Sequence, residues 1–212
     1  IRDGRLWLHT STTLGQMLLG LGIGLSVGLV LGYFIAKSRT LEDLLSPIIV
    51  AFQSTPVVAY APLLVIWFGS GPTSKVITSA LIVFFPMLMN TIIGIRSVPA
   101  SLRDLMGSLG ATRWQMFAKL EIPAAMPVLI GGLKVSATLA VVGAVVGEFV
   151  SASAGLGFLI NVARQQYDTP LVMVAVLTLA VIARAMYGAV SLMETRVLAW
   201  QRRTRRSGSL GA

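Results

Sequence analysis

The chain has 212 residues and a formal net charge of +9, with 55% hydrophobic and only 12% charged residues. Because soluble domains carry about 25% charged residues, this composition predicts a protein embedded in a membrane. A soluble protein of this charge would be a candidate nucleic-acid binder, but basic patches with interleaved aromatic residues that could stack on bases are absent. Cysteine is absent as well, which excludes disulfides and thiolate metal sites, and His9 alone cannot form a metal site.

Five apolar stretches are long enough to cross a membrane as helices, since a hydrocarbon core of about 30 Å needs about 20 helical residues. They predict an all-α membrane protein with a single transmembrane domain over residues 1–212. The stretches are Thr12–Ala36, Leu44–Phe68, Lys75–Ile95, Ala124–Val150 and Pro170–Leu198. The sequence begins with Ile1 and not with Met, so we expect that something upstream of it is missing.

The first apolar stretch carries glycine at every fourth position, at Gly20, Gly24, Gly28 and Gly32. Residues spaced by four lie on one face of a helix, and a face without side chains lets another helix approach closely. The pattern therefore predicts tight packing of this helix against a neighbour.

The second stretch is interrupted by prolines, of which Pro56 follows the polar run Gln53, Ser54 and Thr55. Proline removes a backbone donor and clashes with the preceding helical turn, so the sequence predicts a break in this span. Two interpretations stay open. A broken helix near the middle of the bilayer is one way in which transporters form a binding site, and it can equally be a packing kink satisfied by a neighbouring helix.

A polar stretch, Ser101–Pro127, separates the third apolar stretch from the fourth. Leu102, Leu105, Met106 and Leu109 recur at i, i+3, i+4 and i+7, which predicts an amphipathic helix. These side chains could anchor the helix in a groove of a partner. They could equally pack on the chain's own helices, or the segment could be an ordinary amphipathic helix at the membrane surface.

Start and stop signals divide this stretch into two short helices. Ser101 is a candidate N-cap, with Asp104 three residues later as an acidic version of the capping box. Gly110 fits a left-handed helix stop, and Thr112 with Gln115 repeats the start signal. We therefore predict two helices that meet at an elbow at Gly110, with Trp114 and Phe117 anchoring the second half to the bundle.

Ionisable residues inside predicted spans are functional candidates by default. Glu148 lies near one end of the fourth span, and Arg184 lies within the fifth. Arg184 could pair with Glu148 or Asp168 as a buried structural pair, or it could attract an anionic solute, whereas Lys134 is expected to reach toward the cytoplasm. The residues that we expect along a solute path are Gln53, Ser54, Thr55, Asn90, Ser136, Glu148 and Arg184.

The basic residues divide unequally between the two sides of the predicted bundle. The side of the Gly110 elbow carries Lys37, Arg39, Arg96, Arg103, Arg113, Lys119, Arg196, Arg202, Arg203, Arg205 and Arg206. The opposite side carries Arg2, Arg5, Lys75 and Arg164. Because cytoplasmic loops are enriched in Lys and Arg, the elbow and the basic tail, residues 201–212, are expected in the cytoplasm.

The elbow resembles the cytoplasmic loop of permease subunits in binding-protein-dependent ABC importers. That loop reads E-A-A, three residues, G, nine residues and then I-x-L-P. Here Asp104, Leu105 and Met106 take the E-A-A places, Gly110 takes the glycine, and Leu120, Ile122 and Pro123 take the I, L and P places. The spacing matches throughout, whereas the E-A-A letters match only in the acidic one.

Further passages resemble the nitrate/sulfonate/taurine branch of this family. The runs Gly110–Trp114 and Pro123–Pro127 look like those of the branch. The branch pattern P-x-x-A-x-x-P-L followed by W-F-G-x-G is filled by Pro56, Ala59, Pro62, Leu63, Trp67, Phe68, Gly69 and Gly71. The resemblance covers most of the chain.

The resemblance implies a type I ABC importer-like helical bundle in a bacterial-type inner membrane, with one N-terminal helix missing from this chain. It implies that residues 99–124, here called the elbow loop, form a coupling helix docked on an ATPase subunit. The implied assembly contains a second permease copy in a homodimer, two ATPase subunits and an extracytoplasmic solute-binding protein that delivers a sulfonate, nitrate, vitamin precursor or similar solute. The residues expected nearest the ATPase are Asp104, Leu105, Gly107, Gly110, Ala111, Arg113 and Pro123.

No catalytic constellation is present in the sequence. The phosphate-binding pattern G-x-x-x-x-G-K-[ST] is missing, so ATP and Mg²⁺ are expected in the partner ATPase and no cofactor is expected in this chain. The alternative function is a stand-alone secondary transporter or channel, which would use acidic or histidine relays inside its spans. Glu148 is the one acidic residue that favours it.

Overall fold

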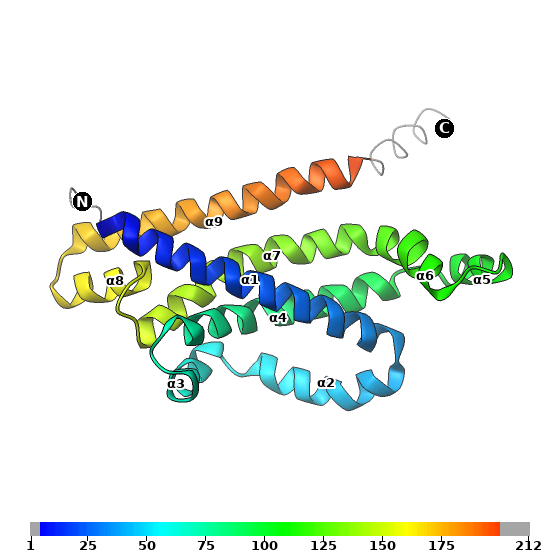
Figure 1. Ribbon diagram of the computed structural model, residues 1–212, viewed down its shortest axis with the longest axis horizontal. Helices are drawn as coiled ribbons and strands as arrows, with labels where there is room; N and C mark the ends of the chain where they lie inside the picture. Colours follow the sequence, from blue (N-terminus) through cyan, green and yellow to red (C-terminus); the bar gives the residue numbers. More distant parts are fainter. Residues whose placement is uncertain (1–4, 200–212) are drawn as a thin grey trace.

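The computed structural model describes residues 5–199, which are helical with short connections. Its long helices run side by side in an elongated bundle (Figure 1). The elements are α1 (Arg5–Lys37), α2 (Arg39–Ser54), α3 (Val57–Phe68), α4 (Pro72–Arg96), α5 (Ala100–Ser108), α6 (Arg113–Met116), the π-helix η1 (Phe117–Glu121), α7 (Ile122–Val150), α8 (Leu156–Gln165) and α9 (Thr169–Val197). The basic tail, residues 201–212, lies outside the described residues.

Four helical segments of the described chain are long and apolar enough to cross a membrane: Leu6–Lys37, Pro72–Arg96, Arg113–Val150 and Thr169–Val197. The fifth candidate is the pair α2 and α3, whose axes differ by 96° across the break at residues 55–56. This pair carries the chain from the elbow end of the bundle back to the end where α4 begins (Figure 1). The predicted spans and the predicted break in the second one are therefore confirmed.

The glycine face of α1 packs directly on α4, as predicted. A Cβ atom added at Gly20 would lie 2.5 Å from the Ser79 Cβ, and one added at Gly24 would lie 2.5 Å from the Ala80 carbonyl oxygen. At Gly32 the Thr91 Cβ would be 2.7 Å away. Real Cβ contacts are longer than these, so the two helices can approach this closely only because glycine occupies these positions.

Replacing Gly24 with leucine is expected to destabilise the bundle by about 2 kcal/mol or more, because the new side chain must push α1 away from Val83 on α4. Gly22 provides a matched control on the same helix, since an added Cβ there meets nothing within 4 Å. Thermal unfolding of the two detergent-solubilised variants would compare them. Equal losses for Gly22→Leu and Gly24→Leu would contradict the close-packing interpretation.

Helix α1 begins at Arg5, whereas the first apolar stretch was expected to begin at Thr12. The extension is stabilised by polar side chains that find partners inside the bundle. The His9 ring accepts a hydrogen bond from the Gly155 N–H at 3.0 Å, and the Thr13 hydroxyl accepts one from the Leu156 N–H at the start of α8. Polar side chains can therefore lie in this part of the helix without being exposed to lipid.

Candidate functional site

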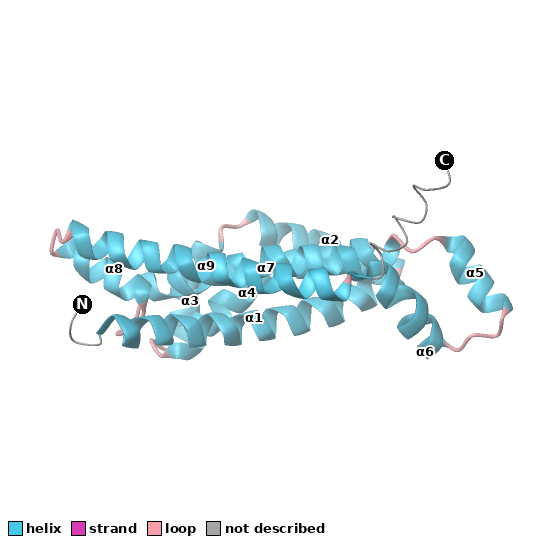
Figure 2. Ribbon diagram, turned by 90° about the horizontal axis from the view of Figure 1, so that it is seen from above, coloured by secondary structure: helices cyan, strands magenta, loops and turns pink. Residues whose placement is uncertain are grey.

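The elbow loop, residues 99–124, projects from one end of the bundle (Figure 2). Helix α5, in its first half, contains no buried residue. Its apolar stripe is open, with Leu102, Leu105 and Leu109 exposed by 42%, 55% and 74%. Three of the four stripe side chains are therefore not covered by the chain's own helices and are available to a partner, whereas Met106 is half-buried. Among the predicted coupling residues, Asp104, Leu105, Gly107, Gly110 and Arg113 are exposed, while Ala111 and Pro123 are half-buried.

The turn between α5 and α6 has the predicted geometry. Gly110 has φ +71°, in the left-handed region that favours glycine. Its N–H donates to the Gly107 carbonyl at 2.9 Å. Thr112 and Gln115 form a reciprocal capping box, in which each side chain accepts a backbone N–H from the other residue, at 3.3 and 2.8 Å. The shape of the elbow is therefore fixed by local bonds.

The predicted N-cap at Ser101 is wrong. Helix α5 begins two residues earlier than a Ser101 cap would place it, at Ala100, with Pro99 at the N-cap position and no side-chain cap. Pro99 has φ −58°, and its carbonyl accepts from the Leu102 N–H at 3.2 Å. A proline with this fixed φ is pre-organised to lead into a helix, so the chain turns helical before Ser101 is reached.

Glu121 connects the elbow loop to the bundle, and the sequence analysis missed it. Its side chain is fully buried in η1 and forms an ion pair with Lys37 at the end of α1. The Tyr33 hydroxyl donates to it at 3.3 Å, and the Arg103 Nε of α5 lies 3.9 Å away. Two cations and a hydroxyl thus surround one buried carboxylate. The sequence did offer one signal for this role, since Glu121 is an isolated acidic residue two positions before Pro123.

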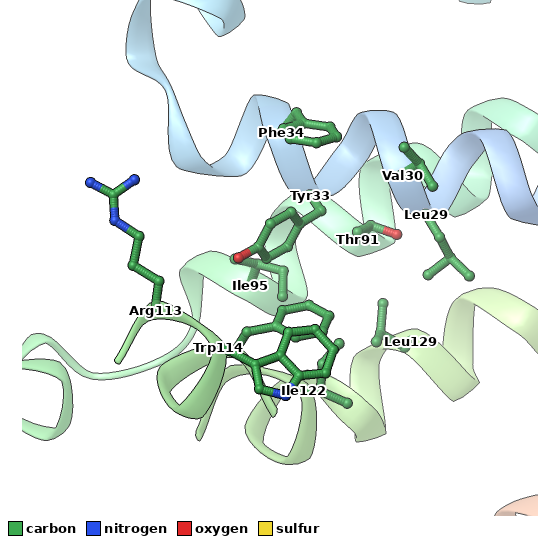
Figure 3. Close-up of a pocket in the computed structure, with 11 residues that line it drawn as sticks. Leu29, Val30, Tyr33, Phe34, Thr91, Ile95, Arg113, Trp114, Ile122 and Leu129 are labelled. Carbon is green, nitrogen blue, oxygen red and sulfur yellow. The ribbon is translucent and has the colours of Figure 1, made fainter. Parts of the chain in front are cut away.

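A largely apolar cavity of about 510 Å³ lies beside this connection, between α1, α4, the second half of the elbow loop and α7. Figure 3 shows Trp114, Tyr33 and Ile122 around it, with Arg113 at its edge. The Phe117 ring stands edge-on to Tyr33, with 5.1 Å between ring centroids, and Trp114 lies 5.3 Å from Phe117. These ring contacts support the prediction that the aromatic pair anchors the loop to the bundle.

At the opposite end of the bundle, Glu148 is 1% exposed and lies in a hydrogen-bonded cluster. The Thr13 hydroxyl donates to its Oε1 at 2.7 Å, and the Gly157 N–H donates to its Oε2 at 2.6 Å. Thr13 also accepts from the Leu156 N–H at 2.8 Å. Glu148 therefore ties the start of α8 to α1 and α7.

Arg184 does not pair with Glu148 or Asp168 in the described residues, so this one of the two roles left open for it is not seen. Asp168 instead caps α9 by accepting from the Leu171 N–H at 3.1 Å. Arg184 is exposed on the face of α9 and makes no ion pair among the described residues. Lys134, which was expected to reach the cytoplasm, forms an ion pair with Glu194 of α9 at 2.5 Å. The relative register of α7 and α9 places Lys134 opposite Glu194.

The remaining path candidates do not form one polar lining. Ser54 and Thr55 donate to carbonyls of their own helix, at Val50 and Ala51. Gln53 is exposed, Asn90 donates to Pro86 at 2.8 Å, and Ser136 donates to Val83 at 3.4 Å. No hydrogen bond in the described part of the chain joins any two of these side chains. The structure therefore brings Gln53, Ser54 and Thr55 to the α2–α3 break but does not bring the full set together.

Comparison with known proteins decides the family. Residues 24–199 match the family described as binding-protein-dependent transport system inner membrane component. The chain belongs to this family. It is therefore the permease subunit of an ATP-driven importer, and the stand-alone transporter considered from the sequence is set aside. Membership implies ATPase subunits and a solute-binding protein as partners.

Individual relatives agree with this assignment. The permease is 47% identical over 201 residues to the riboflavin transport system permease protein RibX of Chloroflexus aurantiacus, covering 95% of this chain and 75% of the relative. It is 32% identical to the formylaminopyrimidine transport permease protein ThiX of Halalkalibacterium halodurans, covering 96% and 81%. The permease fold also matches an inward-facing structure of the MetNI methionine ABC transporter, with a TM-score of 0.73, 20% identity and coverage of 93% and 99%.

Proposed function

We propose that two copies of this permease form a homodimeric translocation unit, and that each elbow loop docks on one ATPase subunit. The observation that carries the proposal is the elbow loop itself. It projects from the bundle, its bend is fixed at Gly110, and its apolar stripe at Leu102, Leu105 and Leu109 is uncovered. An amphipathic helix laid in a groove is a general mode of recognition that uses anchors at this spacing.

The elbow loop is proposed to lie in the cytoplasm. The C-terminal ends of α1, α4 and α9 lie at the same end of the bundle as the loop (Figure 1). The positive-inside rule therefore applies to Lys37, Arg96 and Arg196 together with the basic residues of the loop. The opposite end, where α8 and the α3–α4 turn lie, then faces the solute-binding protein. ATP and Mg²⁺ are bound by the ATPase.

The contacts around the elbow loop suggest how a movement of the ATPase reaches the bundle. The loop is attached to α1 through Glu121 with Lys37 and Tyr33, and it continues directly into α7. The Arg103 guanidinium donates to the Ile95 carbonyl at the end of α4, at 2.6 Å. ATP-driven closure of two ATPase subunits would draw two such loops together and swing these helices as rigid bodies, which is one established form of alternating access.

The solute is proposed to be a vitamin or vitamin precursor that contains a planar ring. The two curated relatives described above carry riboflavin and formylaminopyrimidine in their names, and both molecules contain planar heteroaromatic rings. The solute-binding protein would supply most of the selectivity, and the permease would supply the path.

Co-purification tests the docking proposal. Gly110→Pro is expected to abolish recovery of the co-expressed ATPase with the permease, because proline fixes φ near −65° where the elbow needs +71° and removes the N–H that bonds to Gly107. Asp104→Lys is expected to weaken recovery by reversing the exposed charge of α5. The measurement is the ratio of ATPase to permease in the detergent-purified sample.

Gly131→Ala serves as the matched control, because Gly131 lies within α7 and an added Cβ meets nothing within 4 Å there. It should leave the ratio unchanged. Full ATPase recovery with the Gly110→Pro variant would show that the elbow loop is not the docking site. A native permease that recovers no ATPase and still moves solute would overturn the proposed function itself.

A further inference from the structure

A second cavity, of about 310 Å³, lies beside the break between α2 and α3. Its lining is entirely apolar or aromatic and comes from three helices. The residues are Phe52, Val57, Tyr60, Leu63, Leu64, Trp67, Leu81 and Phe85. Small-molecule sites usually have about 300–1,000 Å³ and are lined mainly by hydrophobic and aromatic side chains, so this cavity is large enough for one ring system.

The cavity lies near the middle of the membrane-spanning length of the bundle. Leu81 and Phe85 stand on either side of the midpoint of α4, which spans Pro72–Arg96. The 96° break between α2 and α3 is at the same level, because Phe52 and Val57 flank it and both line the cavity. Broken helices near the middle of the bilayer are where transporters form solute sites.

The arrangement of the rings favours a flat occupant. The planes of Phe52 and Phe85 are 23° apart with 6.5 Å between their centroids, and Tyr60 lies at 33° to Phe52 with 5.8 Å between centroids. The rings of Tyr60 on α3 and Phe85 on α4 therefore each lie within about 35° of the plane of Phe52 on α2. No hydrogen bond is formed by the Tyr60 hydroxyl or the Trp67 indole N–H within the described residues, so neither group is already engaged by the chain.

We propose that this aromatic cavity, defined by Phe52, Tyr60, Trp67 and Phe85, is the subsite that receives a planar heteroaromatic ring during translocation. This proposal rests on the proposed function, because it places one step of the solute's passage through the permease at this cavity. A neutral ring stacks on aromatic faces with favourable quadrupole alignment. A sulfonate or nitrate ion would lose its hydration water on entering the cavity, and no charged side chain of the lining would replace that water. The only donors in the lining are the Tyr60 hydroxyl and the Trp67 indole N–H.

The polar residues at the break are less suited to this role. The Ser54 hydroxyl donates to the Val50 carbonyl at 2.7 Å, and the Thr55 hydroxyl donates to the Ala51 carbonyl at 3.1 Å. Both hydroxyls are therefore used within α2. From the sequence, these side chains were expected to line the solute path. In the present proposal the aromatic rings beside them contact the solute instead.

The test uses the purified permease–ATPase complex in nanodiscs, without the binding protein, titrated with riboflavin as the planar probe. Stacking on aromatic side chains quenches flavin fluorescence, so quenching is the direct readout. Replacing one stacking residue weakens base–aromatic binding about 5- to 150-fold. We therefore expect Phe85→Leu and Tyr60→Leu each to raise the Kd about tenfold, whereas Tyr60→Phe keeps the ring and stays within about threefold of the native complex.

Phe149→Leu is the matched control, because Phe149 is 44% exposed and does not line the cavity. Taurine, which has no ring, is expected not to displace riboflavin. Absence of quenching, unchanged affinity after Phe85→Leu, or displacement by taurine would each overturn the cavity proposal. Because ATPase recovery is measured in the same samples, these outcomes are distinguishable from failure of the proposed function, in which the ATPase itself would be absent.

Discussion

Replacing Gly155 with alanine is expected to destabilise the permease by about 3 kcal/mol or more, a large effect for the addition of one methyl group. Gly155 has φ +119° and ψ 165°, a backbone region that is essentially restricted to glycine and costs another residue about 1–3 kcal/mol. An added Cβ would also overlap the carboxylate of the buried Glu148. Overpacking of this kind costs about 1–3 kcal/mol in addition.

The overlap with Glu148 also affects neighbouring contacts, because the Glu148 carboxylate is held in place and cannot move aside freely. Its oxygens accept hydrogen bonds from Thr13 and from the Gly157 N–H. Displacing the carboxylate would break these bonds, and a buried carboxylate without donors is strongly unfavourable. We therefore expect the Gly155→Ala variant to loosen the attachment of α8 to α1 as well as to lower the temperature of unfolding.

Gly71 supplies the control for this prediction. It lies at the same end of the bundle, has φ −69°, and an added Cβ there meets nothing within 4 Å. Gly71→Ala should change stability by less than about 0.5 kcal/mol. Unfolding of both variants in detergent, with proteolysis of the α7–α8 connection as a local probe, would compare them. A Gly155→Ala variant as stable as Gly71→Ala would show that Glu148 does not hold this connection.

Local patterns in the sequence were sufficient to predict the elements of this fold. Each span could be predicted from the hydropathy of about 20 consecutive residues. This signal is local, because it depends only on residues within a few helical turns of one another. The break before Pro56, the left-handed Gly110 and the capping box of Thr112 with Gln115 also depend on a handful of adjacent residues. The glycine face of α1 predicted close packing, although the sequence did not say that α4 would be the partner.

Side-chain partners could not be predicted because they join residues far apart in the chain. One of the alternatives for Glu148 was a pair with Arg184, yet its carboxylate accepts hydrogen bonds from Thr13 and a backbone N–H. Lys134 lies opposite Glu194 on α9, sixty positions further along. Which residues face each other follows from the rotation and register of whole helices, and apolar spans carry few signals that fix either. The ion pairs around Glu121 were missed for the same reason.

Replacing Lys37 with methionine is the second change from which we expect a large effect. It would leave Glu121, whose side chain is fully buried, without its ion-pair partner on α1. Breaking a buried ion pair from one side costs about 3–5 kcal/mol. The Lys37 side chain is itself 40% exposed, and Arg103 stays 3.9 Å from Glu121. We therefore expect a smaller loss, of about 2 kcal/mol.

The double variant Lys37→Met/Glu121→Gln separates a specific ion pair from general damage. Glutamine keeps the shape of Glu121 but carries no charge, so no buried carboxylate is left without its partner. We expect the double variant to recover more than half of the stability lost by Lys37→Met alone, which is a coupling that two independent sites would not show. Arg39→Met, which removes an exposed cation two residues away, should change stability by less than about 0.5 kcal/mol.

The same variants test whether this ion pair transmits movement from the elbow loop to α1. In the complex with ATPase and binding protein, Lys37→Met/Glu121→Gln should retain ATP hydrolysis but lose much of its stimulation by the loaded binding protein, because the loop is no longer tied to α1 by charge. A double variant that is stable and fully stimulated would mean that coupling runs through the direct continuation of the loop into α7. Losses that simply add in the double variant would mean that Lys37 and Glu121 act independently, against the contact that joins them.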